Sequence, residues 1–361
     1  MESLFSRARA VAEIDTAALQ QNFATLRAAC GTRVIAVVKA DAYGHGIFHT
    51  VPALLAAGCD FFAVATREEG ELVRALAPRA EILLLGYMPL CQVRAAARAR
   101  LILTLFSKEY AVALSAAAKE EGVRLSAHIK IDIGMNRLGL SCDKNEVRSL
   151  FSLTNLQICG IFTHFPEADS NTEGTRRALE KFCALQSELP TPLFAHAAAS
   201  AAALSLPEAG LDGVRLGIAL YGYPVVESAL SLHRVMRVLS PVIRLRVIEK
   251  GERVGYGGAF VAKKKTLLGT VPLGYADGVM RALSGFPLKV VCTDRVYSAP
   301  IVGRVCMDYL TLDLSDVPAK EGQTVCVFDD FGALAAHCGS IPYEMMTALG
   351  KRVERRQKEA R

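Results

Sequence analysis

A lysine ends an apolar run in the first part of the chain and is followed by a loop of small residues. Lys39 closes the run VIAVVK, and ADAYGHG (40–46) comes directly after it. Small residues let the backbone approach a ligand closely. A lysine at the edge of an apolar core can lose its proton by desolvation and become a nucleophilic amine, as lysines that form Schiff bases require. The alternative is a lysine whose charged end simply reaches solvent.

A second polar group lies in HIKIDIGMNRLG (128–139). Lys130 and Asp132 share one face of an extended strand, because side chains alternate along it. A glycine turn then carries Arg137 onward, where its guanidinium can hold a carboxylate or a ring oxygen.

Three later apolar runs also end in residues that could bind a ligand. His164 lies in FTHF, Ser200 follows LFAHAAA, and Arg215 precedes Gly217 and Ile218 in VRLGIAL. Small residues and free backbone N–H groups suit a phosphate. We therefore predict phosphate binding by Ser200, Gly217 and Ile218.

Tyr256 lies among three glycines in VGYGG (254–258). The segment lacks the spacing and the strand-turn-helix context of a dinucleotide-binding G-x-G-x-x-G loop, which argues against that fold. Tyr256 is either a mobile surface aromatic or a phenol delivered into a site.

A metal site is not expected. His45 and His49 are four residues apart, but no H-E-x-x-H context supplies further ligands. The ten cysteines form no C-x-x-C pair, which argues against a zinc or redox motif, and we expect most of them to be small core residues.

The elements that must position these residues alternate between apolar runs and helical patterns. Ser107 caps one helical segment (107–122), and Pro190 stops another (175–190). Apolar runs without alternating polarity suit parallel strands buried on both faces, and eight of them predict an α/β fold with a (β/α)₈ TIM barrel. A doubly wound sheet is the competing topology. The expected strands are 33–40, 61–65, 81–86, 101–106, 124–132, 156–165, 193–198 and 213–220.

After Leu232 the pattern changes to short strand-like runs separated by Gly, Pro and Asp. We therefore predict two packed domains, a barrel over residues 1–232 and a mostly-β C-terminal domain over residues 233–361.

The composition describes a globular chain of 361 residues, 52% hydrophobic and 22% charged, with a net charge of +6. The last eleven residues (351–361) contain six Lys or Arg against two Glu, which we interpret as solvated surface and not as a nucleic-acid interface. Charged residues interrupt every long apolar run, and residues 1–10 lack the apolar block of a secretory signal. We expect a cytoplasmic protein with no membrane or nucleic-acid partner.

Taken in order, eight motifs resemble those of the alanine racemase family over nearly the whole chain. They are AVVKADAYGHG (36–46), HIKIDIGMNRLG (128–139), FTHF (162–165), VRLGIALYG (214–222), VGYGG (254–258), GYADG (274–278), GRVCMD (303–308) and IPYE (341–344). The resemblance implies a pyridoxal 5′-phosphate (PLP) barrel with a C-terminal β domain. It also implies a homodimer in which Tyr256 reaches the partner's active site.

The resemblance also implies a role for each matching residue. Lys39 would hold PLP as a Schiff base and act as one base of a two-base racemisation, with Tyr256 as the other. Arg137 and the backbone of Met307 would bind the substrate carboxylate. The implied cofactor-binding residues are Lys39, Tyr43, His164, Ser200, Arg215, Gly217, Ile218 and Tyr343, with Arg215 facing the pyridine nitrogen. The implied supporting residues are Tyr275, Asp308 and Lys130, and this lysine can be carbamylated in the family.

The implied reaction interconverts L-alanine and D-alanine and supplies D-alanine for cell-wall peptidoglycan. The alternatives are a racemase that prefers L-serine, a noncatalytic PLP-binding protein and a PLP-dependent decarboxylase. A carrier would be a barrel alone, and a decarboxylase would favour an acidic residue where Arg215 stands. The sequence departs from the family at Ala199, where an asparagine is usual, and in a shortened segment over residues 327–340.

Overall fold

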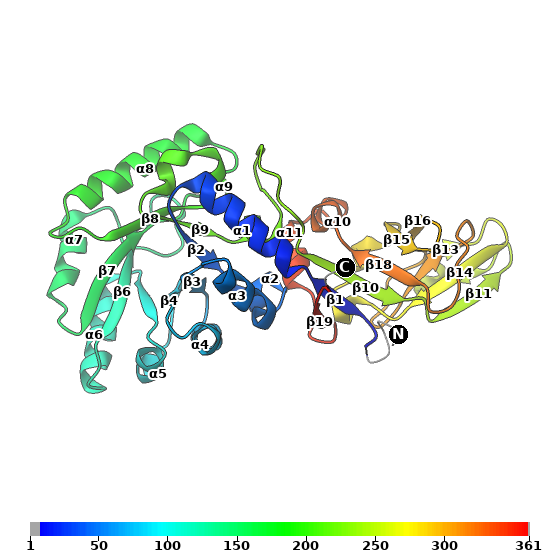
Figure 1. Cartoon of the computed structure of the whole chain (residues 1–361), viewed down its shortest axis with the longest axis horizontal. Coiled ribbons are helices and arrows are strands. Elements are labelled where there is room, and N and C mark those ends of the chain that lie inside the picture. The colour runs from blue at the N-terminus through cyan, green and yellow to red at the C-terminus, as the bar shows by residue number, and fades with distance from the viewer. Residues whose placement is uncertain (1–7, 360–361) are drawn as a thin grey trace. The chain divides into compact units, whose positions relative to one another are not determined.

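The computed structural model describes residues 8–359, which form two compact units (Figure 1). One unit holds residues 17–43 and 50–233, and the other holds residues 8–16, 44–49 and 234–359. The domain ranges 1–232 and 233–361 remain predictions, and their residues 1–7 and 360–361 lie outside the described part of the chain. Each unit is described by itself.

The first unit is built on a closed barrel of eight parallel strands, and this confirms the expected fold class. The last strand pairs with the first, as in the pair Val34 and Val214, so a doubly wound sheet with two open edges is wrong. The strands are β2 (Arg33–Val37), β3 (Phe61–Val64), β4 (Glu81–Leu84), β5 (Ile102–Leu105), β6 (Leu125–Lys130), β7 (Leu156–Phe162), β8 (Phe194–Ala199) and β9 (Gly213–Leu216).

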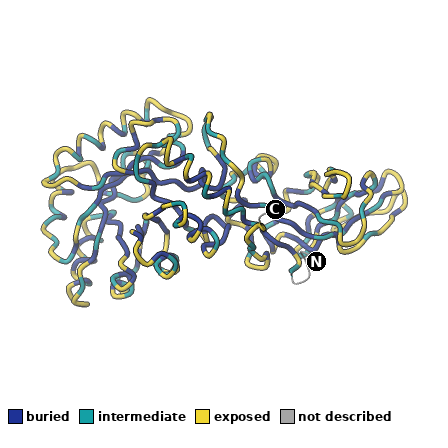
Figure 2. The backbone as a smooth tube through the Cα atoms, in the orientation of Figure 1, coloured by how far each residue is buried: buried dark blue, intermediate teal, exposed yellow. Residues whose placement is uncertain are grey.

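Each of these strands lies within one of the eight expected apolar runs, apart from one extra residue at the end of β8. Their residues are mostly buried, while the surrounding helices carry exposed stretches (Figure 2). Because all eight strands are parallel, the residues that follow their carboxyl ends meet at one end of the barrel.

Helices separate the strands, and several of them begin at side-chain caps. Ser107 accepts the N–H of Tyr110 at the start of α6, as its sequence predicts. Thr66 and Glu69 form a reciprocal capping box at the start of α4. The helices are α1 (Thr16–Cys30), α2 (Lys39–Tyr43), α3 (Ile47–Ala56), α4 (Arg67–Leu76), α5 (Val93–Arg98), α6 (Lys108–Glu120), α7 (Lys144–Ser149), α8 (Thr172–Ser187) and α9 (Ser200–Ser205).

The second unit is mostly β, as predicted. Its sheets have the strand orders β16-β15-β18-β10-β1-β19, β11-β14-β17 and β12-β13. The strands are β1 (Val11–Ile14), β10 (Met236–Pro241), β11 (Arg244–Ile248), β12 (Arg253–Val254), β13 (Phe260–Val261), β14 (Thr266–Val271), β15 (Pro287–Val291), β16 (Val296–Pro300), β17 (Leu310–Asp313), β18 (Thr324–Phe328) and β19 (Glu354–Gln357). Two short helices, α10 (Phe331–Cys338) and α11 (Pro342–Thr347), complete it.

The first strand belongs to this β unit, although the sequence places it next to the barrel. Val11 pairs antiparallel with Leu239 of β10 and parallel with Glu354 of β19. The chain therefore begins in one unit, builds the barrel and returns, an arrangement that local sequence patterns do not reveal.

Two smaller observations concern the sequence-based expectations. Only Cys59 and Cys326 are buried among the ten cysteines, so the expectation that most of them are core residues is wrong. Within residues 8–359, none of the helices combines the length and the apolar character that crossing a membrane requires.

Candidate active site

Lys39 lies just beyond the end of β2, at the carboxyl end of the barrel. Val38, immediately before it, is fully buried. Burial lowers the pKa of the Lys39 amine, and the charges of Arg137 and Arg215 lower it further, while Glu69 opposes the shift. The amine therefore loses its proton more readily than an exposed lysine does, as a nucleophile or base requires.

The turn after Lys39 is left-handed. Its four residues have φ between 52° and 54°, and none is glycine. They are Ala40, Asp41, Ala42 and Tyr43. Such a conformation costs about 1–2 kcal/mol for each L-residue, so its surroundings must impose it. Glu69 accepts the N–H of Ala40 at 2.7 Å, and Ala42 donates to the carbonyl of Val38 at 2.9 Å.

Asp132 holds the loop that carries Arg137. Its Oδ1 accepts the N–H groups of Gly134 (2.9 Å) and Asn136 (3.0 Å), and its Oδ2 accepts the N–H of Arg137 (3.0 Å). Partial burial acts to raise the pKa of Asp132, but these three donors outweigh it and keep the pKa below its ordinary value. The sequence places Asp132 on the face of Lys130 without a role, whereas in the structure it fixes the backbone of the loop at Arg137.

We expect Asp132→Ala to raise KM for the amino-acid substrate about tenfold or more, because hydrogen bonds to a charged group contribute about 1.5–3 kcal/mol. Steady-state kinetics at pH 7 measures the change. Asp143→Ala is the matched control, because Asp143 also accepts a backbone N–H, that of Asn145 at 2.8 Å, but at the start of α7. Equal KM values in the two variants would contradict this role for Asp132.

Lys130 ends β6 inside the barrel. Burial, followed by the charges of Arg137 and Arg215, lowers its pKa to about 8, although Asp132 acts in the opposite direction. Its Nζ lies 6.0 Å from the ring centroid of Phe162. A fraction of this amine is therefore neutral near pH 7 and can react as a nucleophile.

The Arg215 guanidinium is buried on β9 and donates to acceptors on β8 and directly after β7. It donates to the carbonyl oxygens of Thr163 (2.6 Å), Ala197 (2.8 Å) and His196 (3.0 Å). Burial lowers the pKa of Arg215 to about 9, which leaves it charged at pH 7. The Nδ1 of His164 lies 3.4 Å from it, and burial together with the Arg215 charge lowers the pKa of that imidazole to about 3, so it is neutral.

The three predicted phosphate-binding residues and Tyr43 gather between β8, β9 and the turn after Lys39. The Oγ of Ser200 accepts the N–H groups of Gly217 (3.2 Å) and Ala219 (3.4 Å). A Cβ added at Gly217 would overlap the hydroxyl of Tyr43, so this close approach requires glycine. Ile218 is 1% exposed. The group offers hydroxyls and backbone N–H groups at the carboxyl end of the barrel, which suits a phosphate.

Tyr256 lies in the β unit, on a short turn between β12 and β13. Its exposed fraction is 73%, which is high for a large hydrophobic residue. Gly255 and Gly257 have φ of 73° and 69°, values that favour glycine. The turn therefore leaves the phenol exposed on the surface of the β unit.

Two other loops of the β unit carry the predicted substrate-binding and supporting residues. Tyr275 donates its N–H to the carbonyl of Cys306 (3.0 Å), and Ala276 donates to that of Met307 (3.1 Å). A Cβ at Gly274 would overlap this backbone, so the two loops lie in direct contact. Tyr275, Met307 and Asp308 are thus brought together.

Tyr343 lies on α11, and its carbonyl accepts the hydroxyl of Thr347 at 2.8 Å. The segment that follows Tyr43 packs on the same helix, because a Cβ at Gly44 would overlap the carbonyl of Met346. The loop that starts at Lys39 therefore continues into the β unit.

The charges at the end of the barrel favour an anionic ligand. The interacting side chains comprise four cations and two carboxylates. They are Lys39, Lys130, Arg137 and Arg215 against Glu69 and Asp132. This excess of positive charge, the Ser200 cradle and the amine of Lys39 together fit a PLP phosphate, its aldehyde and a substrate carboxylate.

Two family models cover both units. The models described as alanine racemase N-terminal domain and alanine racemase C-terminal domain match residues 14–224 and 235–357. The chain belongs to the alanine racemase family. Enzymes of this family are PLP-dependent racemases, which are isomerases.

Individual alanine racemases match over nearly their full length. The chain is 36% identical to alanine racemase 1 of Clostridium acetobutylicum, covering 95% of this chain and 94% of that protein. Among solved structures, the biosynthetic alanine racemase of Pseudomonas aeruginosa is 36% identical with a TM-score of 0.86, covering 98% and 100% of the two chains. The alanine racemase of Bartonella henselae with covalently bound pyridoxal phosphate is 31% identical with a TM-score of 0.86, covering 97% and 100%.

One departure from the alanine racemase pattern has a clear structural consequence. Ala199 is the N-cap residue of α9, with extended backbone angles, and it makes no side-chain cap hydrogen bond. An asparagine at an N-cap accepts a backbone N–H from the first turn of its helix. The helix that begins with Ser200 therefore lacks the side-chain cap that an asparagine at position 199 would supply.

We expect Ala199→Asn to raise the free energy of unfolding by about 0.5–2 kcal/mol, because it supplies this cap. Urea denaturation of the apoprotein measures the change. Ala201→Asn, inside α9, is the control and should destabilise slightly, because asparagine is a weaker helix former than alanine. A lower stability for Ala199→Asn would show that the cap does not form.

Two arginines of the basic tail make contacts in this alanine racemase fold that the sequence-based prediction did not include. Arg352 donates to Oδ1 of Asp277 and Oδ1 of Asp308, both at 2.8 Å, and so ties together the loops that carry Tyr275 and Met307. Arg355 donates to four backbone carbonyls, including that of Gly44 at 3.0 Å. The interpretation of this tail as solvated surface is wrong for Arg355, which is half-buried, and agrees with the exposure of Arg352. The acceptors that lie opposite these side chains, which the spacing does not show, decide their contacts.

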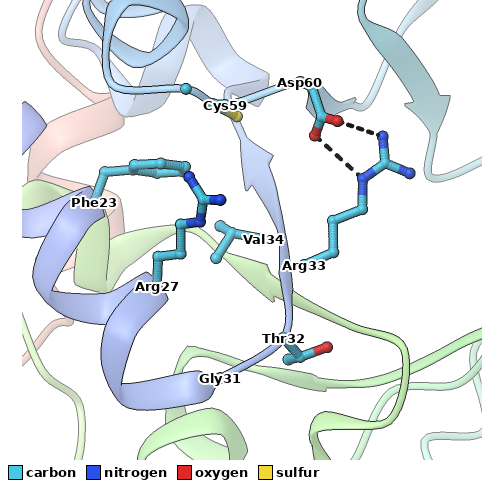
Figure 3. Close-up of a pocket in the computed structure, with 9 residues that line it drawn as sticks. Phe23, Arg27, Gly31, Thr32, Arg33, Val34, Cys59 and Asp60 are labelled. Atoms are coloured by element: carbon cyan, nitrogen blue, oxygen red, sulfur yellow. Dashed lines mark hydrogen bonds and ion pairs between the residues drawn. The ribbon is translucent and has the colours of Figure 1, made fainter.

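A hollow of about 420 Å³ lies elsewhere on the barrel, where β2 begins (Figure 3). Arg33 lines it and is held by Asp60 and Glu81, both at 3.0 Å. Lys39 follows the opposite end of the same strand, so this hollow is not the family's active site.

Proposed function

We propose that this chain is a PLP-dependent racemase that interconverts L-alanine and D-alanine. The single observation that carries the proposal is the cluster of Lys39, Arg137 and Arg215 at the carboxyl end of the barrel, in a chain that belongs to the alanine racemase family. The expected product, D-alanine, would serve peptidoglycan synthesis from a cytoplasmic enzyme. Among the structural relatives, the alanine racemase of Bacillus anthracis is described with bound L-Ala-P.

We infer that PLP is held by the residues that match the family's cofactor-binding positions. They are Lys39, Tyr43, His164, Ser200, Arg215, Gly217, Ile218 and Tyr343. When bound, PLP withdraws electrons from Cα of the amino acid and makes the Cα proton removable. Ser200 and the backbone N–H groups beside it would bind the phosphate, and Lys39 would hold the cofactor covalently.

Racemisation requires two proton-transferring groups on opposite faces of Cα, because a single base would return the proton to the face it came from. We assign one face to the amine of Lys39, whose lowered pKa favours a neutral base. The phenol oxygen of Tyr256 is assigned to the other face. Its high exposure fits a residue that is delivered to the site of a second copy of the chain in a homodimer.

Arg215 sets the electronic character of the site. A guanidinium can only donate hydrogen bonds, so a ring nitrogen that faces Arg215 must accept and stays unprotonated. An unprotonated ring withdraws electrons less strongly, which restrains side reactions such as transamination. A decarboxylase would need the opposite arrangement, with an acid at this position.

The substrate carboxylate is assigned to Arg137 and the backbone of Met307. Lys130 supports Arg137 in this proposal, because its partly neutral amine can attack CO₂, form an N–C bond and release one N–H proton to solvent, which leaves a carbamate anion. The anion would pair with Arg137 and reduce the excess of positive charge in the barrel.

Chiral chromatography tests the proposed function. The purified protein is incubated with PLP and, separately, with L-alanine and L-serine, and the D-isomer is measured over time. We expect D-alanine to form faster than D-serine. Absence of both D-isomers in a protein that binds PLP would favour the noncatalytic alternative, and faster D-serine formation would favour the serine racemase.

A further inference from the structure

Three buried side chains form a hydrogen-bonded chain inside the barrel. Nη1 of Arg215 on β9 lies 2.8 Å from Nδ1 of His196 on β8. Nε2 of His196 in turn lies 2.9 Å from Nδ1 of His128 on β6. The three residues are 4%, 0% and 2% exposed, so water does not compete for these bonds.

Elementary hydrogen-bond chemistry fixes the direction of this chain. Arg215 can only donate, so Nδ1 of His196 must be the acceptor and carries no proton. The proton of His196 is then on Nε2 and is donated to Nδ1 of His128. It follows that His128 also carries its proton on Nε2. Each bond in the chain therefore points away from Arg215.

Both imidazoles are neutral, which this arrangement requires. Burial, followed by the charge of Arg215, lowers the pKa of His128 to about 3 and holds that of His196 well below its ordinary value. A neutral imidazole that donates at one nitrogen becomes a better acceptor at the other, so the second histidine strengthens the bond between the first and Arg215.

Packing prevents either ring from turning to another orientation. The ring of His196 stacks on Phe162 with centroids 4.8 Å apart and planes 6° apart. His128 packs against Phe61 and Phe194 and lies where a Cβ at Gly160 would overlap it.

We propose that His196 and His128 are positioning residues that hold the Arg215 guanidinium in one orientation, as a donor only, through a proton chain of fixed direction. The part of this proposal that concerns the cofactor rests on the proposed function, because it assumes that Arg215 faces the pyridine nitrogen of PLP. The direction of the chain itself does not depend on the reaction. The partners of Arg215 in this chain are neutral imidazoles. They hold its charged guanidinium without offering a carboxylate that could accept its proton.

The direction is tested on the full-length apoprotein labelled with ¹⁵N-histidine. Nitrogen NMR distinguishes protonated from unprotonated ring nitrogens, and His128→Gln and His196→Asn identify the two residues among the seven histidines of the sequence. We expect both rings to be neutral at pH 7, with the proton on Nε2. A proton on Nδ1 of either ring, or a charged ring, would overturn the proposal. This result is independent of activity and therefore separates the proposal from the proposed function.

A matched pair of variants tests whether the chain orients Arg215. The side-chain amide of asparagine falls near the position of Nδ1, so His196→Asn can still accept from Arg215, whereas the longer His196→Gln places its amide near Nε2. We expect PLP to dissociate from His196→Gln with a Kd raised about tenfold or more, and from His196→Asn with a Kd close to that of the wild type. The absorption spectrum of bound PLP should change more in His196→Gln than in His196→Asn. An equal rise in the Kd for PLP in both variants would assign His196 a merely structural role.

Discussion

Replacing Lys39 by alanine should abolish the interconversion of L- and D-alanine. We expect the rate to fall by at least about 10³-fold, because a group that acts both as a covalent anchor and as a base is lost. Chiral chromatography measures the rate, and gel filtration in denaturant measures whether PLP remains attached. Stability should change little, because burial and the charges of Arg137 and Arg215 already disfavour the charged form of the amine that is removed.

Lys144→Ala is the matched control for this experiment. Lys144 is an exposed lysine of the same unit that forms an ion pair with Glu188 at 3.1 Å, and such pairs contribute about 0–1 kcal/mol. The control should racemise alanine at the wild-type rate. A Lys39→Ala variant within tenfold of that rate would remove Lys39 from the mechanism.

Replacing Tyr256 by phenylalanine should have the second largest effect, a loss of about 10²–10⁴-fold in racemisation, the range expected for a general acid or base. Folding should be unaffected because the side chain is 73% exposed. If Tyr256 and Lys39 act on opposite faces, each enantiomer presents its Cα proton to only one of them. In Tyr256→Phe, the enantiomer that faces Lys39 should still exchange its Cα hydrogen with D₂O without inversion.

Proton NMR in D₂O measures this exchange for L- and D-alanine separately. The control is Tyr297→Phe, because Tyr297 donates to Asp294 at 2.6 Å within the β unit and has no assigned role. Exchange and racemisation that fall together for both enantiomers would contradict the two-base assignment. Racemisation at the wild-type rate would remove Tyr256 altogether.

The barrel could be predicted because its strands are continuous apolar runs, which only burial on both faces explains. Lys39 was found for the related reason that a cation at the end of such a run is unusual. The pairing of β1 with β10 and β19 could not be predicted, because it joins residues far apart in the sequence.

The missed site residues share a physical cause. His128 and His196 lie within apolar strands, and the sequence of such a strand does not show whether a single polar residue in it has a hydrogen-bonding partner. Arg352 and Arg355 stand in a run of charges that resembles exposed surface. Their roles depend on which carboxylates and carbonyls lie opposite them, and only the fold brings these together.

The turn from Ala40 to Tyr43 has one more consequence, which concerns handedness. Its angles, φ 53° and ψ 52° at Ala40, are close to the mirror image of an ordinary helical turn. For an amino acid of opposite configuration the steric preference is inverted, so D-alanine at position 40 or 42 would lie in its favoured region. A semisynthetic chain with D-alanine at position 42 should therefore hold this turn with less strain. The backbone beside Lys39 suits the configuration of the proposed product better than that of the L-alanine which the ribosome places there.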